Sequence, residues 1–314
     1  MSKPDVLVMA AARQKAMIQL ADQYQLHRYD EADDRTAFLA QYGERCRAIV
    51  TDGHTDLTEA HLKLLPNVRI VACSSAGYET IDTQALAKRN IPLTNSSAAL
   101  IDDVADLALL LTLAARRELI SAHRYVQNGD WAREGMYPLL SCIRGKNAGI
   151  VGLGNIGQAI AKRLEPLGLN IGYTARSEKS VPYSYYPDSL SLTQWADILI
   201  VVLPGGTATE KLINEPVLSA LGSQGTLINV GRGTVLDETA LLSCLQNGRI
   251  ASAGLDVYWN EPQPNPELVA LPNVVLYPHH ASGTVETRDA MSQLVVDNLA
   301  AHFSGESLIT PVQL

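Results

Sequence analysis

The strongest constraint on the fold is the way short apolar segments alternate with longer helical ones along most of the 314-residue chain. The short segments are DVLVMA (5–10), AIVTD (48–52), RIVACS (69–74), AGIVGL (148–153), DILIVVL (197–203) and TLINV (226–230). Alternation of this kind predicts βαβ units. Several of the segments are apolar throughout, which is typical of parallel strands covered by helices on both faces. The sequence therefore predicts an α/β fold with largely parallel sheets.

The chain length favours two domains, because a domain averages about 150 residues. After His280 the chain holds one more helix, which is too little for a domain of its own. Its apolar residues at helical spacing are Met291, Leu294, Val295, Leu299 and Phe303. We expect this helix to pack on the start of the chain. The prediction is a discontinuous domain of residues 1–98 and 282–314, with a second domain, residues 99–281, inserted into it.

Composition and charge exclude several classes of protein. Apolar residues make up 46% of the chain and charged residues 18%, as in folded domains. The net charge is −8 and the basic residues are scattered, so no nucleic acid partner is expected. The longest nearly apolar run, Val104–Ala115, is shorter than the about 20 residues that span a bilayer, so no membrane partner is expected. The N-terminus lacks a long apolar leader and the four cysteines form no CxxC pair, so we expect a cytoplasmic location and no metal site.

A glycine motif, GLGNIGQAIAKRL, directly follows the apolar segment 148–153 and opens a predicted helix. Glycines at this spacing permit a tight turn, close approach of a pyrophosphate to the backbone, and close packing of helix on strand. A glycine-rich turn before an ordinary helix is the alternative. Gly168 then ends the helix and NIGYT (170–174) begins a second strand, which favours dinucleotide binding. The predicted coenzyme contacts are Gly152, Gly154, Asn155, Ile156 and Gly157.

The end of the second strand bears on which coenzyme is bound. NAD-binding units place an acidic residue there for the ribose 2′-hydroxyl. In this chain Glu178 lies beyond Arg176 and Ser177, two residues whose side chains suit a 2′-phosphate. The sequence therefore favours NADP over NAD.

Three further segments complete the pattern: INVGRGTVLDETAL (228–241), AGLDVYWNEP (253–262) and LYPHHASGT (276–284). With the glycine motif they resemble the D-isomer-specific 2-hydroxyacid dehydrogenases. SSAGYETID (74–82) and LIDDVADLALLLTLAARR (100–117) resemble that family's substrate loop and interdomain helix. The resemblance is strongest to the NADPH-linked glyoxylate, hydroxypyruvate and hydroxyphenylpyruvate reductases. It implies two Rossmann-like domains and hydride transfer from NADPH to the keto carbon of a small 2-keto acid.

The resemblance also assigns the site residues. It implies that Arg232, Glu261 and His279 are catalytic, although His280 stands where the family usually has an apolar residue. Arginine binds a carboxylate bidentately, histidine gives a proton to a developing alkoxide, and a carboxylate beside the histidine favours its imidazolium form. The implied substrate-binding residues are Ala76, Gly77 and Tyr78, and the implied further coenzyme contacts are Pro204 and Asp256.

The resemblance further implies a homodimer. A helix predicted from about Asp102 to Gln127 leads to Trp131, which falls where the family has a dimer arm; the alternative is that Trp131 anchors a loop to its own core. Aromatic keto acids are the rival substrates. A dinucleotide-sensing protein like the corepressors of this fold is the rival function, whereas a formate-dehydrogenase-like enzyme is disfavoured because it expects glutamine at Glu261.

Overall fold

The computed structural model describes residues 3–314, which form two compact units. One unit consists of the chain up to Leu100 together with Ser282–Leu314, and the other is Ile101–Ala281. Each contains one sheet, and every pair of neighbouring strands in both sheets is parallel. The expected α/β fold with two parallel sheets is confirmed. The roles that the sequence assigns to the two parts of the chain stay a prediction.

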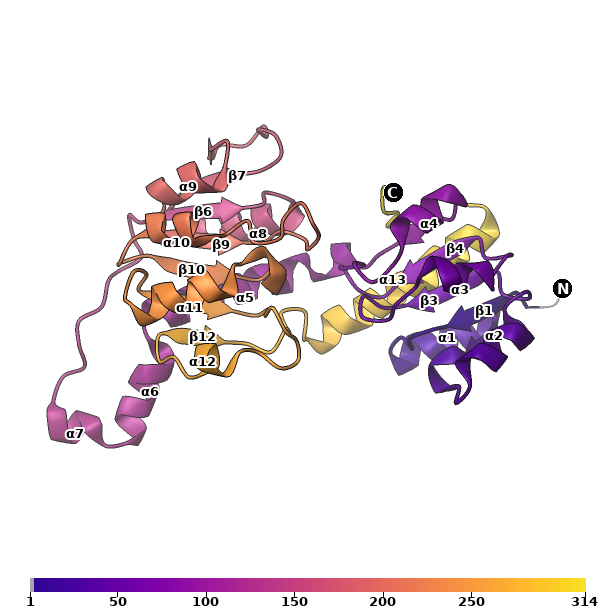
Figure 1. Cartoon of the computed structure of the whole chain (residues 1–314), viewed down its shortest axis with the longest axis horizontal. Coiled ribbons are helices and arrows are strands. Elements are labelled where there is room, and N and C mark those ends of the chain that lie inside the picture. The colour runs from indigo at the N-terminus through magenta and orange to yellow at the C-terminus, as the bar shows by residue number, and fades with distance from the viewer. Residues whose placement is uncertain (1–2) are drawn as a thin grey trace. The chain divides into compact units, whose positions relative to one another are not determined.

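The first unit has a five-stranded sheet in the order β2-β1-β3-β4-β5. Its strands are β1 (Asp5–Val8), β2 (Gln25–Arg28), β3 (Ala48–Thr51), β4 (Ile70–Cys73) and β5 (Leu93–Thr94). Its α-helices are α1 (Gln14–Gln23), α2 (Arg35–Tyr42), α3 (Glu59–Lys63), α4 (Thr83–Lys88) and α13 (Val285–Ser304). The helix α13 belongs to this unit (Figure 1). Its Val295, Val296 and Leu299 pack against apolar residues of β1, β3 and β4. The helix near the end of the chain thus completes the core formed by the strands near its start.

The second unit has a seven-stranded sheet in the order β12-β11-β10-β9-β6-β7-β8. Its strands are β6 (Asn147–Val151), β7 (Asn170–Thr174), β8 (Ser184–Tyr185), β9 (Ile198–Val201), β10 (Thr226–Asn229), β11 (Ser252–Leu255) and β12 (Val274–Leu276). Its α-helices are α5 (Ile101–Arg116), α6 (Leu119–Gln127), α7 (Asp130–Glu134), α8 (Asn155–Leu164), α9 (Ser189–Trp195), α10 (Glu215–Leu221), α11 (Glu238–Gln246) and α12 (Pro266–Val269). Among residues 3–314, no helix is long and apolar enough to cross a membrane.

Helices cover both faces of this second sheet, which explains why its strands are apolar on both sides (Figure 1). The helices α5 and α8 contact each other on one face. The helices α9, α10 and α11 pack together on the other and share a core with Leu199, Val201 and Leu227. Small residues allow close packing: a Cβ added at Gly254 of β11 would lie 3.0 Å from the Leu111 Cβ of α5.

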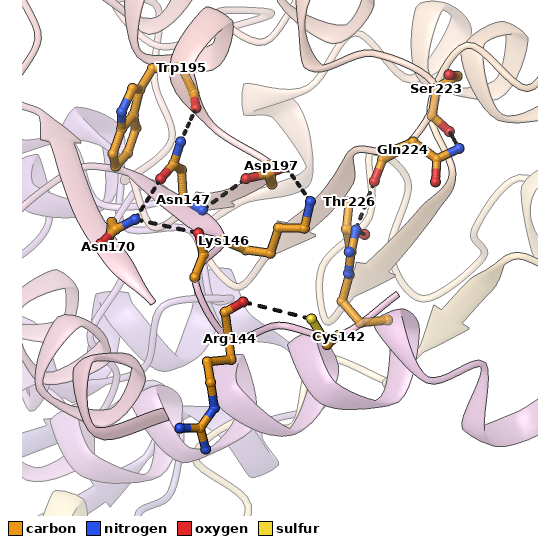
Figure 2. Close-up of polar contacts among 12 residues, drawn as sticks. Cys142, Arg144, Lys146, Asn147, Asn170, Trp195, Asp197, Ser223, Gln224 and Thr226 are labelled. Atoms are coloured by element: carbon orange, nitrogen blue, oxygen red, sulfur yellow. Dashed lines mark hydrogen bonds and ion pairs between the residues drawn. The ribbon is translucent and has the colours of Figure 1, made fainter. Parts of the chain in front are cut away.

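The amino ends of the central strands are tied together by polar side chains, as Figure 2 shows. Asp197, just before β9, accepts a hydrogen bond from the Asn147 backbone N–H (2.9 Å) and pairs with Lys146 (3.1 Å). The Asn147 amide donates to the Trp195 carbonyl (2.9 Å), and its oxygen accepts from Asn170 (3.0 Å). These bonds fix β6, β7 and β9 at one edge of the sheet and leave the opposite, carboxyl edge for the loops that carry the motifs.

The prediction of one continuous helix from Asp102 to Gln127 is wrong. The structure has two helices there, α5 and α6, separated by a break at Glu118, whose φ of 48° is left-handed. The Glu118 carboxylate accepts a hydrogen bond from the Tyr137 hydroxyl (2.8 Å), so a contact distant in sequence accompanies the break. As a result α6 and α7 project away from the sheet of the second unit (Figure 1).

Candidate active site

The glycine motif lies at the carboxyl end of β6, where the strand order reverses between β7 on one side and β9 on the other. Such a switch point is where open α/β sheets bind ligands. Gly152 has a φ of 104°, and a Cβ at Gly157 would lie 2.1 Å from the Gly152 carbonyl oxygen, so both positions require glycine. A Cβ at Gly154 would meet nothing within 4 Å, which leaves open space in front of the α8 N-terminus. These features fit a bound pyrophosphate.

The other predicted coenzyme residues follow strands of the same sheet. Asn155 and Ile156 are the first two residues of α8. Arg176 and Ser177 follow β7 and are exposed, and Pro204 follows β9 and is also exposed. Because all these strands are parallel, their carboxyl ends share one edge of the sheet, so the structure brings these residues to the edge at which the glycine motif lies.

Arg232 follows β10 and is held by Asn229, a fully buried residue at the end of that strand. The Asn229 side-chain oxygen accepts from the Gly231 N–H (3.0 Å), and its amide donates to the Arg232 carbonyl (3.0 Å). Gly233 packs so closely on Tyr258 that a Cβ there would lie 1.9 Å from the Tyr258 carbonyl. Glycine at this position therefore lets the Arg232 segment lie against the loop that leads to Glu261.

His279 and Glu261 form the central contact of the site. His279 follows β12, and its Nδ1 lies 2.5 Å from the Glu261 Oε2. The second carboxylate oxygen, Oε1, accepts from the Tyr258 backbone N–H (2.9 Å). The side chains of His279 and Glu261 are 33% and 30% exposed. This geometry fixes the imidazole plane and directs Nε2 away from Glu261.

The electrostatics keep the Glu261 carboxylate charged. Burial raises the pKa of Glu261, but the hydrogen bonds from His279 and Tyr258 and the charges of His279 and Arg232 lower it further, so its pKa lies below the ordinary value. The carboxylate is consequently ionised at neutral pH. It can stabilise a positive charge on His279 while the imidazole holds a proton.

Asp256 positions the segment that carries His279. It follows β11, is 1% exposed, and accepts from the backbone N–H groups of His280 (2.8 Å) and Ala281 (3.2 Å). His279 itself has a φ of 47°, a left-handed conformation that a histidine keeps only when its surroundings impose it. Burial raises the pKa of Asp256, against the lowering by these hydrogen bonds. The nicotinamide contact that the resemblance implies for Asp256 stays a prediction.

The two neighbouring histidines differ in environment. His280 is exposed and supplies its backbone N–H to Asp256, whereas the side chain of His279 pairs with Glu261.

Sequence reasoning missed the anchoring roles of Asn229 and Tyr258, since neither stands out in a strand end or a loop. Among residues 3–314, no group of three or more histidine, cysteine, aspartate or glutamate residues could hold a metal ion.

The predicted substrate residues Ala76, Gly77 and Tyr78 follow β4 in the first unit, whereas Arg232, Glu261 and His279 belong to the second. The Asn95 amide donates to the Ala76 carbonyl (3.0 Å). In a trans peptide the N–H points opposite to the C=O, so this bond directs the Gly77 N–H away from Asn95. A Cβ at Gly53 would lie 2.3 Å from the Gly77 oxygen, so the neighbouring loop also fixes this segment.

Comparison with known proteins agrees with this geometry. Residues 109–281 match the family model of the D-isomer specific 2-hydroxyacid dehydrogenase, NAD binding domain. The chain is 42% identical to a glyoxylate/hydroxypyruvate reductase A of Arabidopsis thaliana, covering 98% of each chain, and 42% identical to a hydroxyphenylpyruvate reductase of Plectranthus scutellarioides, covering 94% of each. Its structure matches the NADPH-dependent glyoxylate/hydroxypyruvate reductase of Sinorhizobium meliloti in complex with NADP and malonate, with a TM-score of 0.89, 40% identity and coverage of 99% and 97%. The chain belongs to the D-isomer-specific 2-hydroxyacid dehydrogenase family.

Proposed function

We propose that this protein reduces a small 2-keto acid, glyoxylate or hydroxypyruvate, to the 2-hydroxy acid with NADPH. The observation that carries the proposal is the 2.5 Å contact between His279 Nδ1 and Glu261 Oε2, at the sheet edge that also carries Arg232 and the glycine motif. A proton donor beside an ionised carboxylate, near a cation, is what reduction of a keto acid requires.

The chain's own residues divide the chemistry among them. Arg232 binds the substrate carboxylate. NADPH held at the glycine motif would supply the hydride that reduces the keto carbon. The carbonyl π electrons move to oxygen, and His279 gives that oxygen a proton from Nε2. Glu261 holds the imidazole in place and stabilises its charged form before transfer.

NADPH is the proposed coenzyme because the segment after β7 presents a guanidinium at Arg176 and a hydroxyl at Ser177, both exposed. Ala175 stands at the strand end where NAD-linked members of the family place an aspartate. The similarity to an NADPH-dependent reductase supports the same choice. NAD is the less favoured coenzyme.

A second candidate substrate is hydroxyphenylpyruvate, which the similarity to a hydroxyphenylpyruvate reductase favours. Steady-state assays with glyoxylate, hydroxypyruvate, pyruvate, phenylpyruvate and hydroxyphenylpyruvate, each with NADPH and NADH, decide between the two. We expect the highest kcat/KM with glyoxylate or hydroxypyruvate and NADPH, at least tenfold above the aromatic acids. The opposite ranking would transfer the proposal to the aromatic keto acids. Coenzyme binding without oxidation of NADPH by any of the five would instead favour a dinucleotide-sensing protein.

We also propose a homodimer formed through α6, α7 and the segment that follows them. None of the described residues in α6 or α7 is buried, and Trp131 is 64% exposed, so it does not anchor a loop to its own core. Met136 and Leu139 are 81% and 92% exposed. The same segment lines a pocket of about 610 Å³. Exposed apolar residues grouped in one projecting segment are typical of an interface, and a second copy would bury them.

Leu139→Glu should therefore convert the dimer into a monomer of 33.9 kDa, measured by light scattering across a dilution series. A charge at a residue that is buried by the partner weakens association by at least tenfold. Ile18→Glu is the matched control, because Ile18 is also an exposed apolar residue but lies on α1. A monomeric wild-type protein, or equal effects of the two variants, would argue against this interface.

We propose that the protein acts in the cytoplasm. All four cysteines, Cys46, Cys73, Cys142 and Cys244, are free thiols. Free thiols persist in the reducing conditions of the cytosol.

A further inference from the structure

The segment Ala175–Glu178, which carries the proposed 2′-phosphate contacts, is held by a residue that precedes it. Tyr173 lies in β7 and its side chain is fully buried. Its hydroxyl accepts a hydrogen bond from the Lys179 backbone N–H (2.7 Å) and donates to the Lys179 carbonyl oxygen (3.3 Å). A buried side chain thus fixes an exposed residue, Lys179, at the far end of the segment.

The hydrogen bonds of the Tyr173 hydroxyl indicate its structural role. A buried phenol is stable only when its hydroxyl has partners, and a phenylalanine would fill the same space without needing them. Both partners of Tyr173 are backbone groups of one residue, Lys179, in an otherwise exposed stretch. The hydroxyl therefore serves the segment and not the packing of the core.

The two ends of the segment are fixed independently. At its start, the Thr174 carbonyl accepts from the N–H of Gly152 (3.0 Å), which joins the segment to the glycine motif. At its end, Lys179 is bound by the Tyr173 hydroxyl. The next anchor is β8 and the residue after it, Tyr186, whose N–H donates to the Tyr173 carbonyl (2.8 Å). Without the hydroxyl, the unanchored stretch would extend from 175–178 to 175–183, and ordering it around a ligand would cost more conformational entropy.

We infer that Tyr173 is a positioning residue for coenzyme selectivity: its hydroxyl holds Arg176 and Ser177 in the arrangement that receives the 2′-phosphate of NADPH. The inference rests on the proposed preference for NADPH. Because Tyr173 is buried, it acts through the segment. NADH lacks the phosphate that the segment binds, so loss of the hydroxyl affects NADPH selectively.

The test is Tyr173→Phe, which keeps the ring in the core and removes the hydroxyl. Fluorescence titration should show NADPH binding weakened about three- to tenfold, as expected for loss of one or two hydrogen bonds, with NADH binding within twofold of wild type. In steady-state assays KM for NADPH should rise while kcat stays within twofold. Hydrogen exchange measured by mass spectrometry should become faster in the peptide that contains the Lys179 N–H, in the absence of any coenzyme.

Tyr185→Phe is the matched control, because the Tyr185 ring lies 5.5 Å from that of Tyr173 on the neighbouring strand. It should change neither selectivity nor exchange at Lys179. Arg176→Ala separates the positioning role of Tyr173 from the proposed preference for NADPH on which it rests. If wild type prefers NADPH and Arg176→Ala abolishes the preference, but Tyr173→Phe leaves it intact, the inference is wrong and the proposed coenzyme stands. Equal weakening of both coenzymes by Tyr173→Phe also overturns it, and a wild-type preference for NADH overturns both.

Discussion

His279→Ala should lower kcat for 2-keto acid reduction by a hundred- to ten-thousandfold while NADPH binding stays within about twofold of wild type. A positioned general acid contributes a rate factor of this size. We propose that the coenzyme is held mainly at the glycine motif, which follows β6, so removal of an imidazole beyond β12 should leave most of its contacts intact. Single-turnover reduction of glyoxylate measures the chemical step, and fluorescence titration measures the coenzyme.

His280→Ala is the matched control for this experiment. His280 is exposed, and its contact with Asp256 uses the backbone N–H, which alanine retains. The variant should keep kcat within about threefold of wild type. A greater loss of kcat in His280→Ala than in His279→Ala would mean that His280, not His279, is the proton donor.

Glu261→Gln separates the charge of the carboxylate from its place beside His279. The pKa of Glu261 lies below its ordinary value, so the wild-type group is ionised throughout the range from pH 6 to 8. Its contribution is therefore constant over that range. We expect the variant to reduce keto acids more slowly at every pH there, with coenzyme binding retained.

Much of the fold could be predicted from the sequence because buried parallel strands are continuous apolar runs. The six quoted segments all overlap strands of the structure. The strand β11, Ser252–Leu255, gave no such signal, since its sequence SAGL contains small residues that allow α5 to approach. The break in the helix at Glu118 was also unpredictable, because neither glycine nor proline marks it and the accompanying contact, with Tyr137, is remote in sequence.

The candidate site divides in a similar way. Motifs predict which residues follow which strands, and the parallel order of β10, β11 and β12 brings Arg232, Asp256 and His279 to one edge. A motif does not show which side chain forms a hydrogen bond with each backbone group of the site. The bonds from Asn229 to the Arg232 segment and from Asp256 to the His279 segment depend on the loop conformations, which the strand pattern leaves undetermined.

Arg176→Ala should weaken NADPH binding by about ten- to a hundredfold and leave NADH nearly unchanged. A charge-assisted hydrogen bond to a phosphate accounts for a factor of this size. Arg176 and Ser177 are exposed after β7, so the truncation removes no packing from the core. The effect should appear in KM more than in kcat, because the 2′-phosphate lies far from the transferred hydride.

The double variant Ala175→Asp with Arg176→Ala should reverse the preference. An aspartate at the end of β7 accepts hydrogen bonds from the ribose hydroxyls of NADH and repels a 2′-phosphate, so selectivity gains a repulsive element as well as losing an attractive one. The ratio of kcat/KM for the two coenzymes measures the change, and raised salt should reduce the advantage of NADPH in wild type because both groups are exposed. A lower KM for NADH than for NADPH in wild type, or equal weakening of both coenzymes by Arg176→Ala, would assign the segment after β7 another role.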